Sequence, residues 1–129
     1  MIFDNKTIKF MTKLIRLTSD NQLVWSLQNA PSSLTEGTNS IIPLYFETVF
    51  KEKNLAIYSL RYQDFNPENE SMYWSEKIVF VVLDFQNRVV WEMNEHSPAL
   101  LDLMNTIREK ESGINDLLDD MLDYKDEIF

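Results

Sequence analysis

His96 is the only histidine of the chain, and its side chain is the one best suited by type to acid–base chemistry near neutral pH. A catalytic triad or a metal site built on it would need partners, and there is no cysteine to act as nucleophile or thiolate ligand. Because His96 directly precedes Ser97 and Pro98, which mark a helix start, we expect a structural or solvent-exposed imidazole in a loop. With only Gly37 and Gly113, the chain also lacks a glycine-rich loop for phosphate. An enzyme is therefore the least favoured class of function.

Asp119, Asp120 and Asp123 match the Asp-Asp-x-x-Asp pattern that holds magnesium and diphosphate in isoprenoid synthases. Carboxylates four residues apart on a helix lie on one face and can share a magnesium ion. Those enzymes are large helical bundles around an apolar cavity, whereas this chain has 129 residues, is rich in strand patterns and contains no second metal-binding motif. The match is interpreted as a chance occurrence in an acidic helix, and we expect neither a metal nor a cofactor.

The C-terminal segment carries more than half of the net charge of −9, because six acidic residues between positions 116 and 127 stand against a single lysine. Four of them share one face of the expected helix, opposite an apolar stripe. These four are Asp116, Asp119, Asp120 and Asp123. Such a face is either the ordinary solvated side of an amphipathic helix or an acidic docking surface for a basic protein. An acid near a helix C-terminus costs up to about 1 kcal/mol, and a partner would be one reason to tolerate that cost.

The composition is that of an ordinary folded domain, with 44% hydrophobic and 26% charged residues on a chain of single-domain length. Twelve Lys and Arg against 21 Asp and Glu give a surface that repels phosphate, so direct binding to nucleic acid or to an anionic membrane is not expected. Charged residues interrupt the first 17 positions, and no apolar stretch reaches the length of a membrane span. Together with the lack of cysteine, this predicts a cytoplasmic protein.

The first element, from Asp4 to Thr18, is expected to be a helix. Ile8, Thr12 and Ile15 recur at helical spacing and would form part of an apolar stripe. A strand is the alternative, because Ile8, Phe10 and Thr12 also fit an alternating pattern.

Five strand-like segments follow, along which apolar residues alternate with others. They are Leu23–Leu27, Ile42–Phe50, Leu55–Tyr62, Met72–Leu83 and Arg88–Met93. The short connections between most of them favour antiparallel pairing of neighbours. Two longer segments contain several turn-forming residues and are interpreted as loops within one domain. They are Asn29–Ser40 and Gln63–Ser71.

The chain ends in two expected helices. Ser97 and Pro98 form a typical N-cap and first-turn pair, and Gly113 is placed to end the helix that they begin. A second helix is expected from Ile114 to about Lys125. The sequence thus predicts a single α+β domain over residues 1–129, in which an N-terminal helix and a C-terminal helical hairpin accompany an antiparallel sheet of about five strands.

One face of this sheet would be covered by helices, and the other would still be rich in apolar side chains. Its expected members are Tyr45, Tyr58, Tyr73, Val79 and Val81. Such an apolar face is not expected to stay bare in water. It could be covered by the N-terminal helix or by other parts of the monomer, or it could be a self-association surface or a ligand groove. Tyr73 and Trp74 follow the acidic loop and point to opposite faces of their strand. Because Tyr and Trp are favoured at binding surfaces, both are candidate contact residues.

Three segments at the two ends of the chain hold patterned apolar residues: Lys13–Thr18, Leu23–Trp25 and Ile114–Leu122. In these segments the chain resembles a group of small uncharacterised bacterial and phage α+β proteins. The resemblance brings no activity, cofactor or site with it.

These patterns favour a non-enzymatic interaction protein, such as an inhibitor, an antitoxin-like or an immunity-like regulator. It would bind a protein partner, basic in charge, through its acidic helix or through the sheet face near Tyr73 and Trp74. The alternative is a homo-oligomer that binds a small ligand in a pocket at the sheet or at a subunit interface.

Overall fold

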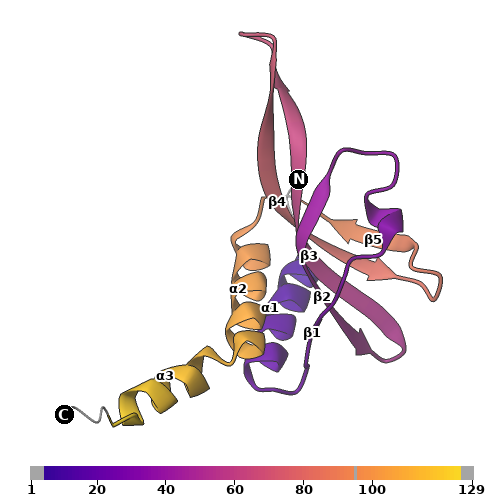
Figure 1. The fold of residues 1–129 in the computed structure, drawn as a ribbon. Helices are drawn as coiled ribbons and strands as arrows, with labels where there is room; N and C mark the ends of the chain where they lie inside the picture. The colour runs from indigo at the N-terminus through magenta and orange to yellow at the C-terminus, as the bar shows by residue number, and fades with distance from the viewer. Residues whose placement is uncertain (1–4, 95, 126–129) are drawn as a thin grey trace.

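The protein folds around one antiparallel sheet, in a computed structural model that describes residues 5–94 and 96–125 (Figure 1). Its elements are α1 (Asn5–Ser19), β1 (Ser26–Leu27), the 3-10 helix η1 (Ser32–Leu34), β2 (Ile41–Phe50), β3 (Lys53–Asn66), β4 (Ser71–Leu83), β5 (Val89–Met93), α2 (Pro98–Ser112) and α3 (Ile114–Asp123). The predicted α+β class is confirmed, with an N-terminal helix, five strands and two C-terminal helices. Asp4, the predicted first residue of the opening helix, lies outside the described residues. No helix in the described part of the chain is long and apolar enough to cross a membrane.

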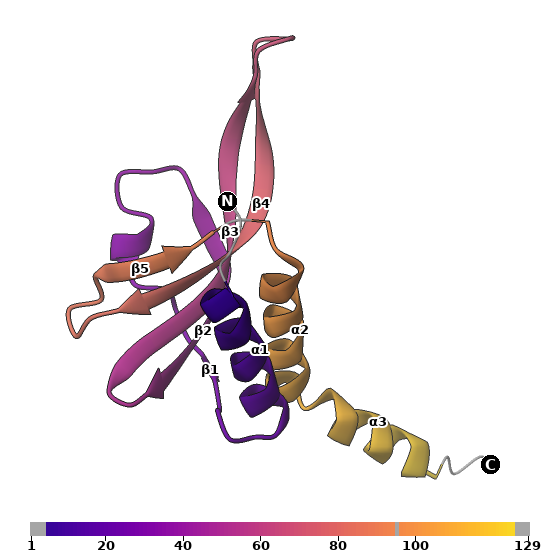
Figure 2. The ribbon, with the colours of Figure 1, turned by 180° about the vertical axis from the view of Figure 1, so that it is seen from behind.

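The strands lie in sequence order, β1-β2-β3-β4-β5, and each neighbouring pair is antiparallel. β3 and β4 form the longest ladder, which runs from the pair Asn54–Leu83 to the pair Asn66–Ser71. The prediction of a loop over residues 63–71 is therefore wrong, because both strands continue into it and only residues 67–70 form the turn. The outer part of this hairpin stands clear of the body (Figures 1 and 2).

The predicted strand Leu23–Leu27 pairs only over its last two residues, Ser26 and Leu27. Before them, the Thr48 hydroxyl donates a hydrogen bond to the Val24 carbonyl at 2.7 Å, so a side chain takes the place of a ladder bond. This leaves a short edge strand.

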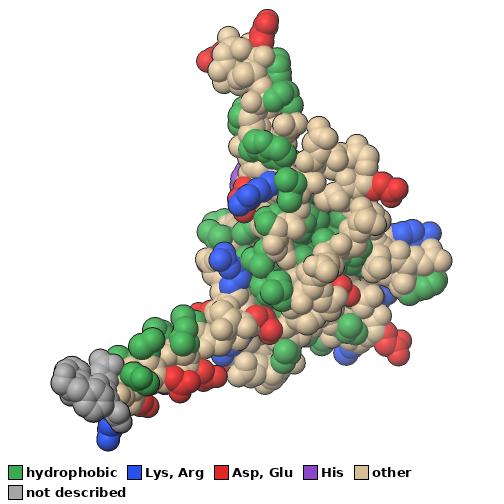
Figure 3. All heavy atoms as spheres, in the orientation of Figure 1, with side chains coloured by type: hydrophobic (Ala, Val, Ile, Leu, Met, Phe, Trp, Pro, Cys, Tyr) green, Lys and Arg blue, Asp and Glu red, His purple; other side chains and the backbone are tan. Residues whose placement is uncertain are grey.

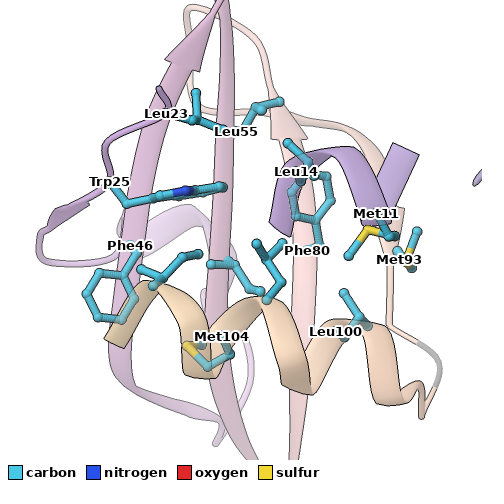
Figure 4. Close-up of a cluster of buried hydrophobic side chains, with 13 residues drawn as sticks. Met11, Leu14, Leu23, Trp25, Phe46, Leu55, Phe80, Met93, Leu100 and Met104 are labelled. Atoms are coloured by element: carbon cyan, nitrogen blue, oxygen red, sulfur yellow. The ribbon is translucent and has the colours of Figure 1, made fainter. Parts of the chain in front are cut away.

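The main core lies between the sheet and the two helices α1 and α2, which run side by side on one of its faces (Figures 2 and 4). Its buried members are Met11, Leu14, Leu23, Trp25, Phe46, Leu55, Ile57, Phe80, Met93, Leu100, Leu103, Met104 and Ile107. In α1 the buried positions are Met11, Leu14 and Thr18, which recur at helical spacing. The helix is thus confirmed over the strand alternative, while Ile8 of the predicted stripe is 51% exposed.

The second face of the sheet is covered within the monomer, by the β1–β2 connection. Ala30, which precedes η1, and Leu34, the last residue of η1, pack on a second cluster of buried residues. That cluster is Tyr45, Ala56, Tyr58, Val79, Val81 and Leu83. The Ser33 hydroxyl also donates to the Asn87 carbonyl at 3.3 Å, which links the connection to the β4–β5 turn. α1 lies on the opposite face, and of the five residues predicted for this face only Tyr73, farther out on β4, stays exposed.

The C-terminal helices begin and end where the sequence predicts, but they point in different directions. Ser97 caps α2 by accepting a hydrogen bond from the Ala99 amide at 3.2 Å, with Pro98 in the first turn. Gly113 takes the left-handed conformation at φ 64° and is the only residue between α2 and α3. From there α3 extends away from the body instead of returning along α2 (Figures 1 and 2). α1 and α2 already fill the helical layer on the sheet, and no residue of α3 is buried.

Candidate interaction surfaces

The four aspartates predicted to form a docking surface are all exposed on α3. Asp116, Asp119, Asp120 and Asp123 share one side of the helix, and acidic side chains line the underside of α3 in Figure 3. None of these carboxylates forms an ion pair with another residue of the described chain. Because like charges three or four residues apart repel, each such pair costs the helix about 0.2–0.5 kcal/mol.

The opposite side of α3 is an apolar stripe that sequence reasoning assigned to a core. Leu117, Leu118, Met121 and Leu122 are between 50% and 83% exposed, and hydrophobic side chains run along the upper side of the helix in Figure 3. The pattern predicts that one face of this helix packs against something, and within the described chain it packs against nothing. A helix of ten residues is marginal on its own in water, so α3 gains from a surface on which this stripe can be buried.

The second projecting element is the outer part of the β3–β4 hairpin, residues 61–66 and 71–76, which we call the arm. Side chains alternate between its two faces. Trp74, Met72 and Phe65 lie on the face that continues the helix-covered side of the sheet, and each is at least half exposed. Sequence reasoning missed Phe65 because it ended the first strand at Tyr62, and it placed Met72 at the start of the next strand without proposing it as a contact residue. The signal for Phe65 was its position among polar neighbours directly ahead of the turn over residues 67–70.

Tyr73 lies on the other face of the arm, beside Asp64, its partner across the ladder. Its hydroxyl donates to Asp64 Oδ2 at 3.3 Å, and the carboxylate charge raises the pKa of the Tyr73 phenol. Tyr73 and Trp74 are both exposed, as a contact residue must be, but they cannot touch one flat partner together.

His96 lines a hollow of about 420 Å³ between the base of the arm and the start of α2. The other walls come from Glu76, Ile78, Pro98 and Leu101, among others. His96 forms no hydrogen bond with another described residue, and the described chain contains no group of three His, Asp or Glu residues placed to hold a metal. A second hollow, of about 410 Å³, lies on the next part of the arm and is lined by Ile41, Arg61 and Trp74 with Ser75 and Glu76. Ser97 also lines the first hollow, but its hydroxyl caps α2 and forms no hydrogen bond with His96 among the described residues.

The predicted contact residues therefore fall into two separate surfaces. The acidic residues lie on α3 below the body, whereas Tyr73 and Trp74 lie on the arm above it (Figure 1). No single small partner surface would contact both sets on one copy of the chain.

Comparison with protein-family models, with curated proteins and with solved structures finds no significant match to this chain. The resemblance to small bacterial and phage proteins therefore stays a prediction. What the chain does has to be argued from the surfaces themselves.

Proposed function

We propose that this protein is a non-enzymatic interaction protein, an inhibitor or an antitoxin-like or immunity-like regulator, that binds a basic protein through the acidic face of α3. The observation that carries the proposal is that α3 extends from the body with four carboxylates on one face that form no ion pair with any other described residue. Those charges repel one another, and a basic partner would relieve the repulsion.

The competing interpretation is that the acidic face is only the solvated side of an amphipathic helix. That interpretation requires the opposite face of α3 to be buried on the body. No residue of α3 is buried, so that explanation lacks its usual basis. The small-ligand alternative would use the two hollows beside the arm. Their walls include exposed side chains such as Arg61, Glu76 and His96, whereas small-ligand sites are enclosed enough to bury most of the surface of the ligand.

The test is affinity capture from an extract of the native host with three immobilised baits. The first bait is the parent chain, and the second carries Asp116→Asn, Asp119→Asn and Asp123→Asn. The third is a matched control with the same charge change away from α3, Glu36→Gln, Glu52→Gln and Glu68→Gln, all at exposed positions. Each bait is washed at low and at moderate salt, and the retained proteins are identified by mass spectrometry.

We expect a basic protein that the parent and the control retain, that salt releases, and that the α3 variant fails to hold. Exposed charge pairs contribute about 0.5 kcal/mol each, so three of them should weaken the purified complex about tenfold. Salt should weaken it as well, since exposed charges are screened over about 8 Å at physiological ionic strength. If the α3 variant retains the same proteins as the parent at both salt concentrations, the acidic face is not the binding surface.

A further inference from the structure

An apolar recess lies along the outer flank of α2, between that helix, β2 and the base of the arm. At its lower end a hollow of about 230 Å³ is lined by Leu27, Leu44 and Arg108. Nearer the arm, Ile41 of β2 and Leu101 of α2 line two larger hollows, and we call the surface that carries all three hollows the α2-flank recess. Hydrophobic side chains cover this region in the view of Figure 3, which also shows the apolar side of α3.

The α3 of the same chain cannot reach this recess by folding back. One residue, Gly113, joins α2 to α3, whereas helix–helix connections in bundles have about 2–8 residues. Connections that are too short for the intramolecular contact favour exchange of the element between copies.

We propose that two copies of the chain form a symmetric dimer in which the apolar stripe of each α3 lies in the α2-flank recess of the other copy. The apolar side of α3 and the hydrophobic side chains beside α2 are both visible from the side of the molecule that Figure 3 shows. A two-fold axis through that side therefore creates both contacts at once, as closed dimers require.

The dimensions of the two surfaces agree. α3 has ten residues and is about 15 Å long. The part of β2 that lines the recess, from Ile41 to Phe46, is about 17 Å long at 3.3 Å per residue.

The charged side chains around the recess balance, since Arg61 and Arg108 line it together with Glu76 and Glu111, whereas the Lys77 ammonium lies 5.1 Å from the Tyr62 ring on the other face of the sheet. The Arg61–Glu76 ion pair is long, at 3.6 Å, and both side chains are more than half exposed, which leaves Arg61 able to face a second acid.

The apolar surface available is what such a dimer needs. Ten large apolar side chains on α3, the recess and the adjoining arm are each at least 50% exposed: Leu117, Leu118, Met121, Leu122, Leu27, Ile41, Phe65, Met72, Trp74 and Leu101. At on the order of 100 Å² for a fully exposed side chain, they offer about 500 Å² per copy. One side of a standard interface buries about 800 Å², of which about 65% is apolar in homodimers.

This inference does not rest on the proposed function, because it uses the opposite side of α3. With the stripe buried in the second copy, Asp116 and Asp123 still face outward. Failure of one proposal therefore leaves the other standing.

The experiment is light scattering of the full chain over a concentration series, with sedimentation equilibrium for the dissociation constant. The parent should approach twice 15.3 kDa. The stripe variant Leu118→Ser/Met121→Ser and the recess variant Ile41→Ser/Leu101→Ser should each raise the dissociation constant at least about a hundredfold. All four positions are at least half exposed in the monomer, and circular dichroism confirms that each variant is folded.

Two further chains sharpen the result. Val49→Ser/Phe85→Ser removes exposed apolar side chains far from the recess and should leave the dimer intact. A Gly-Ser-Gly-Ser insertion after Gly113 lengthens the connection, lets α3 cover the recess of its own chain, and should give a folded monomer. A parent that stays monomeric at high concentration overturns the proposal. So does a dimer that either the stripe variant or the recess variant leaves unchanged.

Discussion

The indole Nε1 of Trp25 donates a hydrogen bond to the Thr18 hydroxyl at 3.0 Å, and this hydroxyl donates in turn to the Leu14 carbonyl at 2.8 Å. Trp25 is 1% exposed and Thr18 is 2% exposed, so neither group has access to water. The Thr18 hydroxyl thus links Trp25, in the segment after α1, to the last turn of that helix by hydrogen bonds. Because a buried indole N–H needs a partner, Thr18 satisfies a polar group inside an otherwise apolar core.

Thr18→Val should lower the free energy of unfolding by about 1–3 kcal/mol, because it preserves the shape of the side chain but leaves the Trp25 N–H without an acceptor. Thr12→Val is the matched control, since the Thr12 hydroxyl makes the same bond to the Ile8 carbonyl at 3.0 Å on the exposed side of α1. The control should change stability by no more than about 0.5 kcal/mol. Urea unfolding of both variants measures the difference, and equal effects would show that the indole bond does not matter.

The fold was open to prediction because it depends on local periodicity. Helical spacing in the first and last segments and alternation in the middle identify the elements, and short connections impose an antiparallel order. The Ser97-Pro98 and Gly113 signals fix the bounds of α2 for a similar reason, since each follows from the backbone geometry of one or two residues.

What sequence could not provide is the partner of each apolar face. The apolar stripe of α3 predicts that one face of this helix is buried. Only the structure shows that α1 and α2 already fill the helical layer on the sheet. The same limit applies to the second sheet face. Ala30 and Leu34 sit in a segment with the composition of a loop, and nothing local indicates that it folds over Tyr45 and Tyr58.

A chain that ends after Ser112 should keep the stability of the folded monomer. No residue of α3 is buried, so its removal should change the free energy of unfolding by less than about 1 kcal/mol when measured at high dilution. Leu103→Ala, at a position that is 0% exposed, should cost about 2–5 kcal/mol under the same conditions. A truncated chain as unstable as the Leu103 variant would mean that α3 packs on its own body in solution.

The protein should lose stability in alkaline solution, through Tyr45 and Tyr58. Burial, with the nearby Glu92 charge, raises the pKa of Tyr58 to about 12, and burial with the hydrogen bond to Glu47 raises the pKa of Tyr45 further. A raised phenol pKa means that the fold favours the neutral form. The stabilisation is therefore complete below pH 10, the usual value, and is lost as the pH rises towards and through 12.

Tyr58→Phe should reduce the slope of the free energy of unfolding against pH above pH 10 by the contribution of about one proton. Tyr124→Phe, at an exposed position, should keep the parental slope. The measurement is the free energy of unfolding as a function of pH, beside tyrosinate absorbance of the folded chain. An unchanged slope in the Tyr58 variant would contradict the assignment.

Asp84 should stabilise the β4–β5 turn only while it is charged. Its Oδ1 accepts hydrogen bonds from the Gln86 and Arg88 amides, both at 2.9 Å, and its Oδ2 accepts from Arg88 Nε at 2.7 Å. These bonds, the Arg88 amide first among them, hold the pKa of Asp84 below its usual 3.8. A lowered carboxyl pKa contributes stability that is present above pH 3.8 and is lost as the pH falls through the lower pKa of the folded state.

Asp84→Asn should thus lower Tm at neutral pH. The difference in Tm from the parent should close at acid pH, as the parent's own carboxylate becomes protonated. Asp102→Asn, on the exposed side of α2, provides the control, and a gap that stays constant down to acid pH would show that the charge of Asp84 is not what holds the turn.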